Sequence, residues 1–178
     1  MRTLPDRFLK QVAPDKADAA LSEAQRHLNE RRWAEAETAF RQLLTAQPAH
    51  PGATLGLARA LIAQGHGSEA ERLLEEFPAS PESVEAETLR PLARFVSEAE
   101  NTGEEALAPI DAQYRQAARL VGRGQFGGAM DAILGVLRRD KRYRKDEPRR
   151  IMLALFKLIG DDDPLTREYR QELASVLY

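Results

Sequence analysis

Apolar residues recur every three or four positions along most of the chain, and this spacing is typical of amphipathic α-helices. In residues 20–48, one apolar face precedes the charged turn at Glu30 to Arg32, and a second apolar face follows it. Residues 51–78 repeat the arrangement around Gly65 and Gly67. No sustained alternation of apolar and polar residues indicates a β-strand. The pattern therefore predicts an all-α fold built from helical hairpins.

The two hairpins share a period of 34 residues. At this offset four pairs of residues superpose, namely Ala24 with Ala58, His27 with Leu61, Ala36 with Ala70, and Phe40 with Leu74. Small residues let the two helices of a hairpin cross closely, and a bulky residue one turn later fills the gap. A helix–turn–helix unit of this length is typical of the tetratricopeptide repeat. We therefore expect a short α-solenoid of about nine to ten helices.

Later segments fit the same design less regularly. Residues 111–140 place Ala117 and Ala129 in the small positions, and Phe126 matches Trp33. About 25 extra residues precede this unit, and they predict a helix from Glu82 to Glu100 with a flexible connection. A fourth pair of helices follows, with its turn near Gly160 and a capping residue at Asp163. The expected organisation is an N-terminal helix and linker over 1–14, two hairpins over 15–78, the inserted helix over 79–109, and two further hairpins over 110–178.

Composition narrows the class of protein. The chain has 178 residues and no cysteine, which excludes disulfides and thiol chemistry within it. The stretch at its N-terminus lacks the apolar core of a signal peptide, and no apolar run approaches the roughly 18 residues of a membrane helix. The chain is thus expected to be a cytoplasmic protein.

Residues 138–150, RRDKRYRKDEPRR, contain eight basic and three acidic side chains. One interpretation is a nucleic-acid-binding arm, since lysine and arginine bind phosphates. The other is a charged connection between two helices, with Arg138 and Arg139 at a helix C-terminus and Asp146 and Glu147 at a helix N-terminus. The net charge of the whole chain is only −2, and no set of stacking aromatic residues accompanies the run. The connection is therefore favoured.

No motif indicates catalysis. Residues 122–127, GRGQFG, match the glycine pattern of dinucleotide sites, but a helix precedes them where such a site requires a strand. The pattern instead predicts the turn of the third hairpin. The three histidines have no ligand-like spacing, and the acidic run at 161–163 is explained by a helix cap. We expect a protein that is not an enzyme and that uses no cofactor and no metal.

Protein binding is the remaining class of function. In a tetratricopeptide stack the first helix of each repeat lines a concave groove. The expected groove residues are mostly apolar and suit a helix or a hydrophobic segment of a partner: Leu21, Gln25, Leu28, Leu55, Arg59 and Ile62. The alternative is that the chain fills its own groove, for which the N-terminal residues Leu4, Phe8, Leu9 and Val12 are suited.

The C-terminal helix is the second candidate surface. Leu165, Tyr169, Leu173 and Val176 form a stripe at helical spacing that is expected to face the core. Leu177 and Tyr178 make the end of the helix apolar, where repeat arrays usually carry polar caps. We expect Leu177 to fold back onto the protein and Tyr178 to be a docking residue.

The C-terminal half also resembles a known family. The "RRD" helix end, the "DEPRR" helix start, the "LFKLIG" stop and the final "YRQELASVLY" are similar to bacterial thioredoxin–tetratricopeptide proteins of the YbbN (CnoX) type. The resemblance extends over residues 15–178. The thioredoxin domain of that family has no counterpart here, and residues 4–15 look like its closing helix and linker, so the chain is expected to be a fragment or a short relative.

The resemblance implies a co-chaperone that holds unfolded clients and passes them to the chaperonin GroEL or to the Hsp70 system. It implies that the terminal helix faces the chaperone, through Tyr169, Arg170, Leu173, Leu177 and Tyr178, and that the groove holds clients. Two other hypotheses stay open. A scaffold or adaptor with one dedicated partner would present a polar, selective groove, and a nucleic-acid-associated protein would use residues 138–150.

Overall fold

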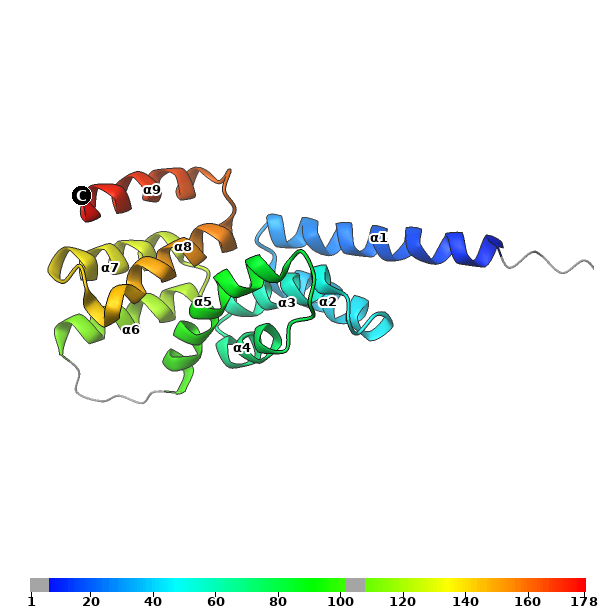
Figure 1. Cartoon of the computed structure of the whole chain (residues 1–178), viewed down its shortest axis with the longest axis horizontal. Helices are drawn as coiled ribbons and strands as arrows, with labels where there is room; N and C mark the ends of the chain where they lie inside the picture. The colour runs from blue at the N-terminus through cyan, green and yellow to red at the C-terminus, as the bar shows by residue number, and fades with distance from the viewer. Residues whose placement is uncertain (1–6, 102–107) are drawn as a thin grey trace, which may run out of the picture.

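The computed structural model describes residues 7–101 and 108–178, with side chains from residue 16 onward. Across these ranges the chain forms nine α-helices, one short 3-10 helix and no strand, which confirms the predicted all-α fold. The elements shown in Figure 1 are α1 (Arg7–Asn29), α2 (Trp33–Ala46), α3 (Pro51–Ala63), α4 (Gly67–Glu75), α5 (Ser83–Asn101), α6 (Pro109–Val121), α7 (Phe126–Arg139), η1 (Tyr143–Asp146), α8 (Glu147–Ile159) and α9 (Pro164–Leu177). None of the described helices has the length and apolar character needed to cross a membrane.

Two hairpins, α1/α2 and α3/α4, form the first half of the molecule. The alanines that the 34-residue offset superposes are completely buried: Ala24, Ala36, Ala58 and Ala70. Their small side chains let the helix backbones approach closely. Gly56 serves the same purpose, because a Cβ at this position would lie 2.2 Å from Cζ of Phe40. The predicted repeat packing is thus confirmed for these two hairpins.

Helix α5 joins the two halves of the molecule. It packs against α4, α6 and α8. Near its C-terminal end, Glu100 accepts hydrogen bonds from the backbone N–H groups of Gly67 (2.9 Å) and Ser68 (3.0 Å) at the start of α4. These N–H groups have no partner within their own helix, so Glu100 caps α4 from outside. The helix expected from Glu82 to Glu100 is confirmed, with both ends shifted by one residue.

Helices α6 and α7 form a third hairpin whose turn packs against the turns of the first two. A Cβ on Gly122 would lie 2.7 Å from the Cα atom of Gly65. The rings of Trp33 and Phe126 meet edge to face, with their centroids 5.8 Å apart. The glycine-rich motif lies in this turn between two helices, as predicted, and its glycines allow the close contact between turns.

Helices α8 and α9 differ from a repeat hairpin. Helix α8 packs mainly on α5, whereas α9 packs on α7. The single hydroxyl proton of Tyr169 in α9 is shared between the carbonyl oxygen of Gly127 (3.1 Å) and a carboxylate oxygen of Asp131 (2.7 Å), both in α7. The predicted helix ends are confirmed, because Gly160 ends α8 and Asp163 accepts a hydrogen bond from the N–H of Leu165 at 2.9 Å.

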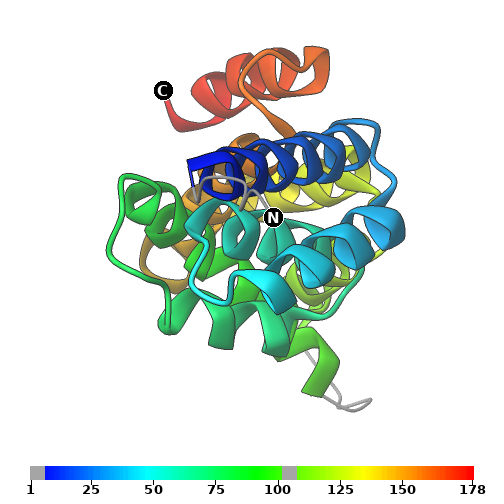
Figure 2. The same ribbon diagram turned by 90° about the vertical axis from the view of Figure 1, so that its right-hand side faces the viewer.

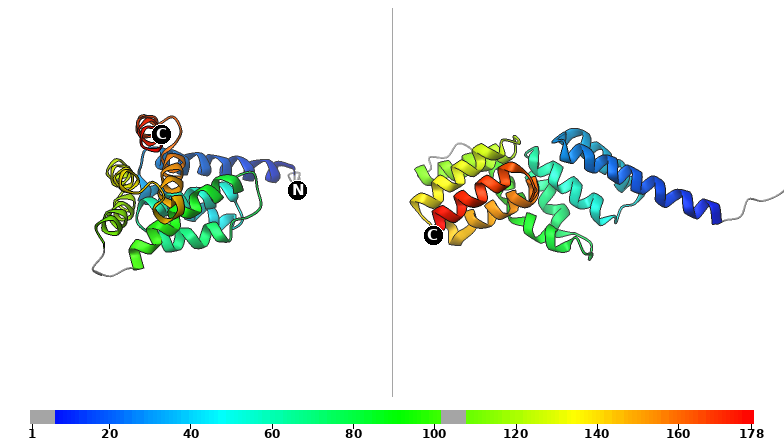
Figure 3. Two further views of the ribbon diagram at one scale, coloured as in Figure 1. Left: turned by 60° about the vertical axis from the view of Figure 1, so that its left-hand side comes forward. Right: turned by 90° about the horizontal axis from the view of Figure 1, so that it is seen from above.

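The molecule is elongated, with α1 near one end, α6, α7 and α9 near the other, and α5 between them (Figure 1). Figure 2, a view along this axis, places α9 at one edge. The N-terminal half of α1 projects beyond α2 and α3, as both panels of Figure 3 show. The side chains of Phe8, Leu9 and Val12, and the whole of Leu4, lie outside the described part, so their predicted contact with the groove stays a prediction.

Candidate functional site

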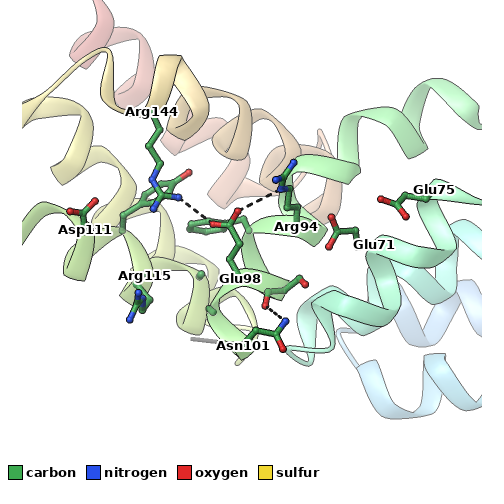
Figure 4. A pocket seen from close by; sticks show the side chains of 13 residues that line it. Glu71, Glu75, Arg94, Glu98, Asn101, Asp111, Arg115 and Arg144 are labelled. Atoms are coloured by element: carbon green, nitrogen blue, oxygen red, sulfur yellow. Dashed lines mark hydrogen bonds and ion pairs between the residues drawn. The ribbon is translucent and has the colours of Figure 1, made fainter. Parts of the chain in front are cut away.

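A hollow of about 700 Å³ opens at the join between the two halves of the molecule. It lies between α4, α5, α6 and η1, and we call it the charged hollow. Figure 4 shows the polar side chains that line it: Glu71, Glu75, Arg94, Glu98, Asn101, Asp111, Arg115 and Arg144. Its size is within the range of pockets that bind small ligands or a few residues of a peptide.

One wall of the charged hollow is acidic. Glu71 and Glu75 lie four residues apart on α4 and therefore on the same face of that helix. Neither forms an ion pair with any side chain in the described ranges, and Figure 4 shows both on the side of the hollow away from Arg144. Two like charges at this spacing destabilise a helix by about 0.2–0.5 kcal/mol. Glu75 is also the last residue of α4, where the helix dipole disfavours an anion.

The floor of the hollow is an ion-pair chain along α5. Glu98 accepts from Arg144 of η1 at 3.2 Å and lies 3.5 Å from Arg94 of its own helix. All three side chains are substantially exposed, so each pair contributes at most about 1 kcal/mol. Because these pairs are weak in water, an incoming charged group can exchange with them at low cost.

An aromatic cluster lies beneath this chain. Phe95 and Tyr114 have ring centroids 4.6 Å apart, and Tyr143 meets Tyr114 edge to face at 5.1 Å. The guanidinium of Arg144 lies over both tyrosine rings, 5.2 Å from the centroid of Tyr114 and 5.7 Å from that of Tyr143. Such cation–π contacts add about 0.5–1 kcal/mol each at exposed sites. Arg144 therefore has a defined position at the basic side of the hollow.

The two tyrosine hydroxyls are held by carboxylates. Tyr114 donates to Glu147 at 3.1 Å, and Tyr143 donates to Asp111. Burial is the main cause that raises the pKa of both phenols, and the neighbouring carboxylates raise these pKa values further; the pKa of Tyr143 rises to about 12. Both phenols are therefore neutral hydrogen-bond donors at neutral pH. These bonds connect η1 and α8 to α6.

The backbone that presents Arg144 is strained. Arg144, Lys145 and Asp146 all have positive φ values of 46°, 54° and 65°. The left-handed conformation costs a non-glycine residue roughly 1–2 kcal/mol, and such residues cluster at functional sites. The contacts of Tyr143 and Arg144 offset this cost. The strained backbone of η1 therefore borders the hollow on one side, and the like charges of Glu71 and Glu75 border it on the other.

A second hollow of about 740 Å³ continues the first toward α8. The two share Glu71, Glu75, Arg94 and Glu98, and the second adds Lys145 and Arg150 on its basic side. Together the two hollows can bind a positively charged group of a partner beside Glu71 and Glu75, and a negatively charged group beside the basic residues.

The basic segment 138–150 connects α7 to α8, as its helix-end interpretation predicted. Arg138 and Arg139 lie in the last turn of α7, and Glu147 lies in the first turn of α8. Arg138 pairs with Glu172 at 3.3 Å, and Arg144 pairs with Glu98. These cations are thus partly neutralised by the protein itself.

The predicted apolar groove is largely closed. Leu28, Leu55 and Ile62 are at most 7% exposed, so they pack in the core and cannot contact a partner in this conformation. Arg59 donates to the carbonyl oxygens of Lys157 and Leu158 in the last turn of α8. Leu21 and Gln25 line a shallow surface hollow between α1 and α3. The expectation of an open apolar groove at the buried positions was wrong, because helical periodicity identifies a buried face without identifying what covers it.

The predicted residues of the terminal helix divide into two groups. Tyr169 and Leu173 are buried, at 7% and 6% exposure, and Leu177 is half-buried. Arg170 pairs with Asp161 and lies over the ring of Phe156. Tyr178 is 97% exposed. Tyr178 is therefore the apolar residue of this set that is free to contact a partner.

Sequence reasoning missed the charged hollow. Its lining comes from four separate elements, and no motif links them. One signal was available, since the pair Glu71 and Glu75 near a helix C-terminus breaks two local rules of helix stability at once.

The fold and the hollow define a short α-solenoid, a class whose stacked helix pairs present binding surfaces to other proteins. Two family models agree with this class. A tetratricopeptide repeat model matches residues 90–178, which is half of the chain, and a second tetratricopeptide repeat model matches residues 27–86. The chain therefore belongs to the tetratricopeptide repeat family. The comparison with curated proteins finds no match.

Proposed function

We propose that this protein is a non-catalytic, cytoplasmic adaptor that binds a segment of a dedicated partner protein in the charged hollow. The observation that carries the proposal is the carboxylate pair Glu71 and Glu75, which has no ion-pair partner within the described ranges and lies on the wall of a hollow of about 700 Å³. Helix stability gives no reason for this pair, whereas a partner cation would. A polar, selective surface is also what the adaptor hypothesis requires.

The test blocks the hollow sterically. A phage-displayed library of random 12-residue peptides is selected on the full chain, and enriched peptides are synthesised and titrated by fluorescence anisotropy. Ala99→Trp inserts a large side chain from the partly buried wall of the hollow, so peptide binding should fall at least tenfold. Ala112→Trp, on an exposed face of α6 outside the lining, is the matched control. Peptides that bind Ala99→Trp as tightly as the unmodified chain would refute the adaptor site.

The narrower co-chaperone proposal rests on a different observation. The ring of Tyr178 is almost fully exposed at the end of α9, in the segment that resembles the thioredoxin–tetratricopeptide family. In this proposal the C-terminal end of α9 docks on the chaperonin GroEL or on the Hsp70 system, and clients are bound elsewhere on the chain.

Purified GroEL, immobilised on a sensor surface, is the direct probe of this second proposal. The unmodified chain should be retained, and Tyr178→Ala should reduce retention without loss of stability, because an exposed ring contributes little to the fold. Leu153→Ala removes another exposed apolar side chain, from α8, as the control. Absence of any GroEL binding by the unmodified chain would exclude docking on this chaperonin.

A further inference from the structure

The charges of the hollow are separated in space. The acidic wall is formed by α4 with Glu71 and Glu75, and the basic wall of the charged hollow by Arg144 of η1. Lys145 and Arg150 continue this basic wall into the second hollow. The two carboxylates on the same side, Asp111 and Glu147, accept hydrogen bonds from Tyr143 and Tyr114. Figure 4 shows Glu71 and Glu75 on one side, Arg144 on the other, and the pair Arg94 and Glu98 between them. Opposite walls of opposite charge favour a ligand that carries both charges on opposite sides.

An extended peptide has this property. Successive side chains of an extended segment point to opposite sides of the backbone. A basic residue next to an acidic residue would therefore direct one charge toward α4 and the other toward η1. Arg144 donates through Nη1 to Glu98, and a guanidinium has five N–H donors. Arg144 can thus bind an incoming carboxylate while its contact with Glu98 is retained.

We propose that the charged hollow binds an extended segment of a partner protein in which a lysine or arginine is adjacent to an aspartate or glutamate, with the cation against Glu71 and Glu75 and the carboxylate against Arg144. This inference rests on the proposed adaptor function and specifies its partner. It also fixes the orientation of the segment across α5. A polyanion such as a nucleic acid is disfavoured, because the α4 wall would repel its phosphates.

The first step of the test is the composition of the selected peptides. The random 12-residue library should yield adjacent basic–acidic pairs with the unmodified chain. Selection on Glu71→Gln/Glu75→Gln should lose the enrichment in lysine and arginine, while glutamine preserves the shape and the helix propensity of each position. Glu168→Gln/Glu172→Gln removes an equal charge at the same spacing on α9 and should leave the enrichment unchanged.

The second step is a charge exchange. The best synthetic peptide should bind Glu71→Gln/Glu75→Gln about tenfold more weakly, which corresponds to about 1.4 kcal/mol. Replacing both glutamates by lysine should further weaken this peptide and restore binding of a version whose basic residue is glutamate. This reciprocal rescue cannot arise from a loss of folding.

The outcomes separate the two proposals. If Ala99→Trp blocks the peptides but the charge variants bind them unchanged, the charge-pair inference is overturned and the adaptor site stands. If the peptides bind Ala99→Trp as tightly as the unmodified chain, both the adaptor proposal and the charge-pair inference are refuted. Peptides that are uniformly apolar or helical, or self-association of the chain through the hollow, would also overturn the inference.

Discussion

The guanidinium of Arg59 donates hydrogen bonds to the carbonyl oxygens of Lys157 (3.2 Å) and Leu158 (2.8 Å) and lies 3.6 Å from a carboxylate oxygen of Glu85. Carbonyl groups at a helix C-terminus have no partner within the helix and attract cations. Burial lowers the pKa of Arg59, and the charge of Glu85 opposes this shift. Arg59 therefore connects α3, α5 and α8. The sequence had instead predicted that Arg59 contacts a partner.

Replacing Arg59 by methionine should lower the free energy of unfolding by about 1–3 kcal/mol, because two charged hydrogen bonds at the end of α8 are lost. Urea denaturation of the full chain measures this change. Arg26→Met is the control, since Arg26 is exposed and forms a surface ion pair with Glu23, and it should change stability by less than about 0.5 kcal/mol. Unchanged stability of Arg59→Met combined with loss of peptide binding would instead support the contact role.

At the scale of elements, the sequence predicts the two repeated hairpins well, but it does not predict which helices α8 and α9 pack against. The positions of Ala24, Ala36, Ala58 and Ala70 follow from a local period, because each hairpin packs on the next one in the chain. The packing of α8 on α5 and of α9 on α7 depends on pairing between distant segments, which periodicity does not encode. The charged hollow forms where these segments meet, so its residues could not be grouped from the sequence.

The strained element η1 gives a prediction about pH. Burial and the hydrogen bond to Asp111 raise the pKa of Tyr143 to about 12, above the value near 10 of an unfolded chain. The folded state therefore holds this proton more tightly, and the stabilisation is complete below about pH 10 and is lost as the pH rises toward 12. Urea denaturation across this interval should show a falling free energy of unfolding.

Tyr143→Phe should make this fall with pH less steep, because it removes the phenol that ionises on unfolding. Part of the slope should persist, since burial also raises the pKa values of Tyr114 and Tyr169. Tyr178→Phe, which alters a ring that is 97% exposed, should leave the slope unchanged. An identical slope for Tyr143→Phe and the unmodified chain would show that η1 does not hold Tyr143 in its buried position.

At the scale of the whole molecule, α5 has a central place. Its residue Glu100 caps the N-terminus of α4. It also packs against α6 and α8, and its residues Arg94 and Glu98 line the floor of the hollow. The hollow thus lies between the two segments that the tetratricopeptide models match, residues 27–86 and 90–178. Binding of a partner segment at this place would connect both halves, so it should stabilise the full chain against unfolding.

The most direct measurement is NMR mapping of the best selected peptide on the isotope-labelled full chain. Chemical-shift changes should concentrate on α4, the C-terminal half of α5, the N-terminal half of α6 and η1, which line the charged hollow. They should be absent from Ala99→Trp at the same peptide concentration. Changes confined to α9, or to the surface between α1 and α3, would contradict the account and place the partner site elsewhere.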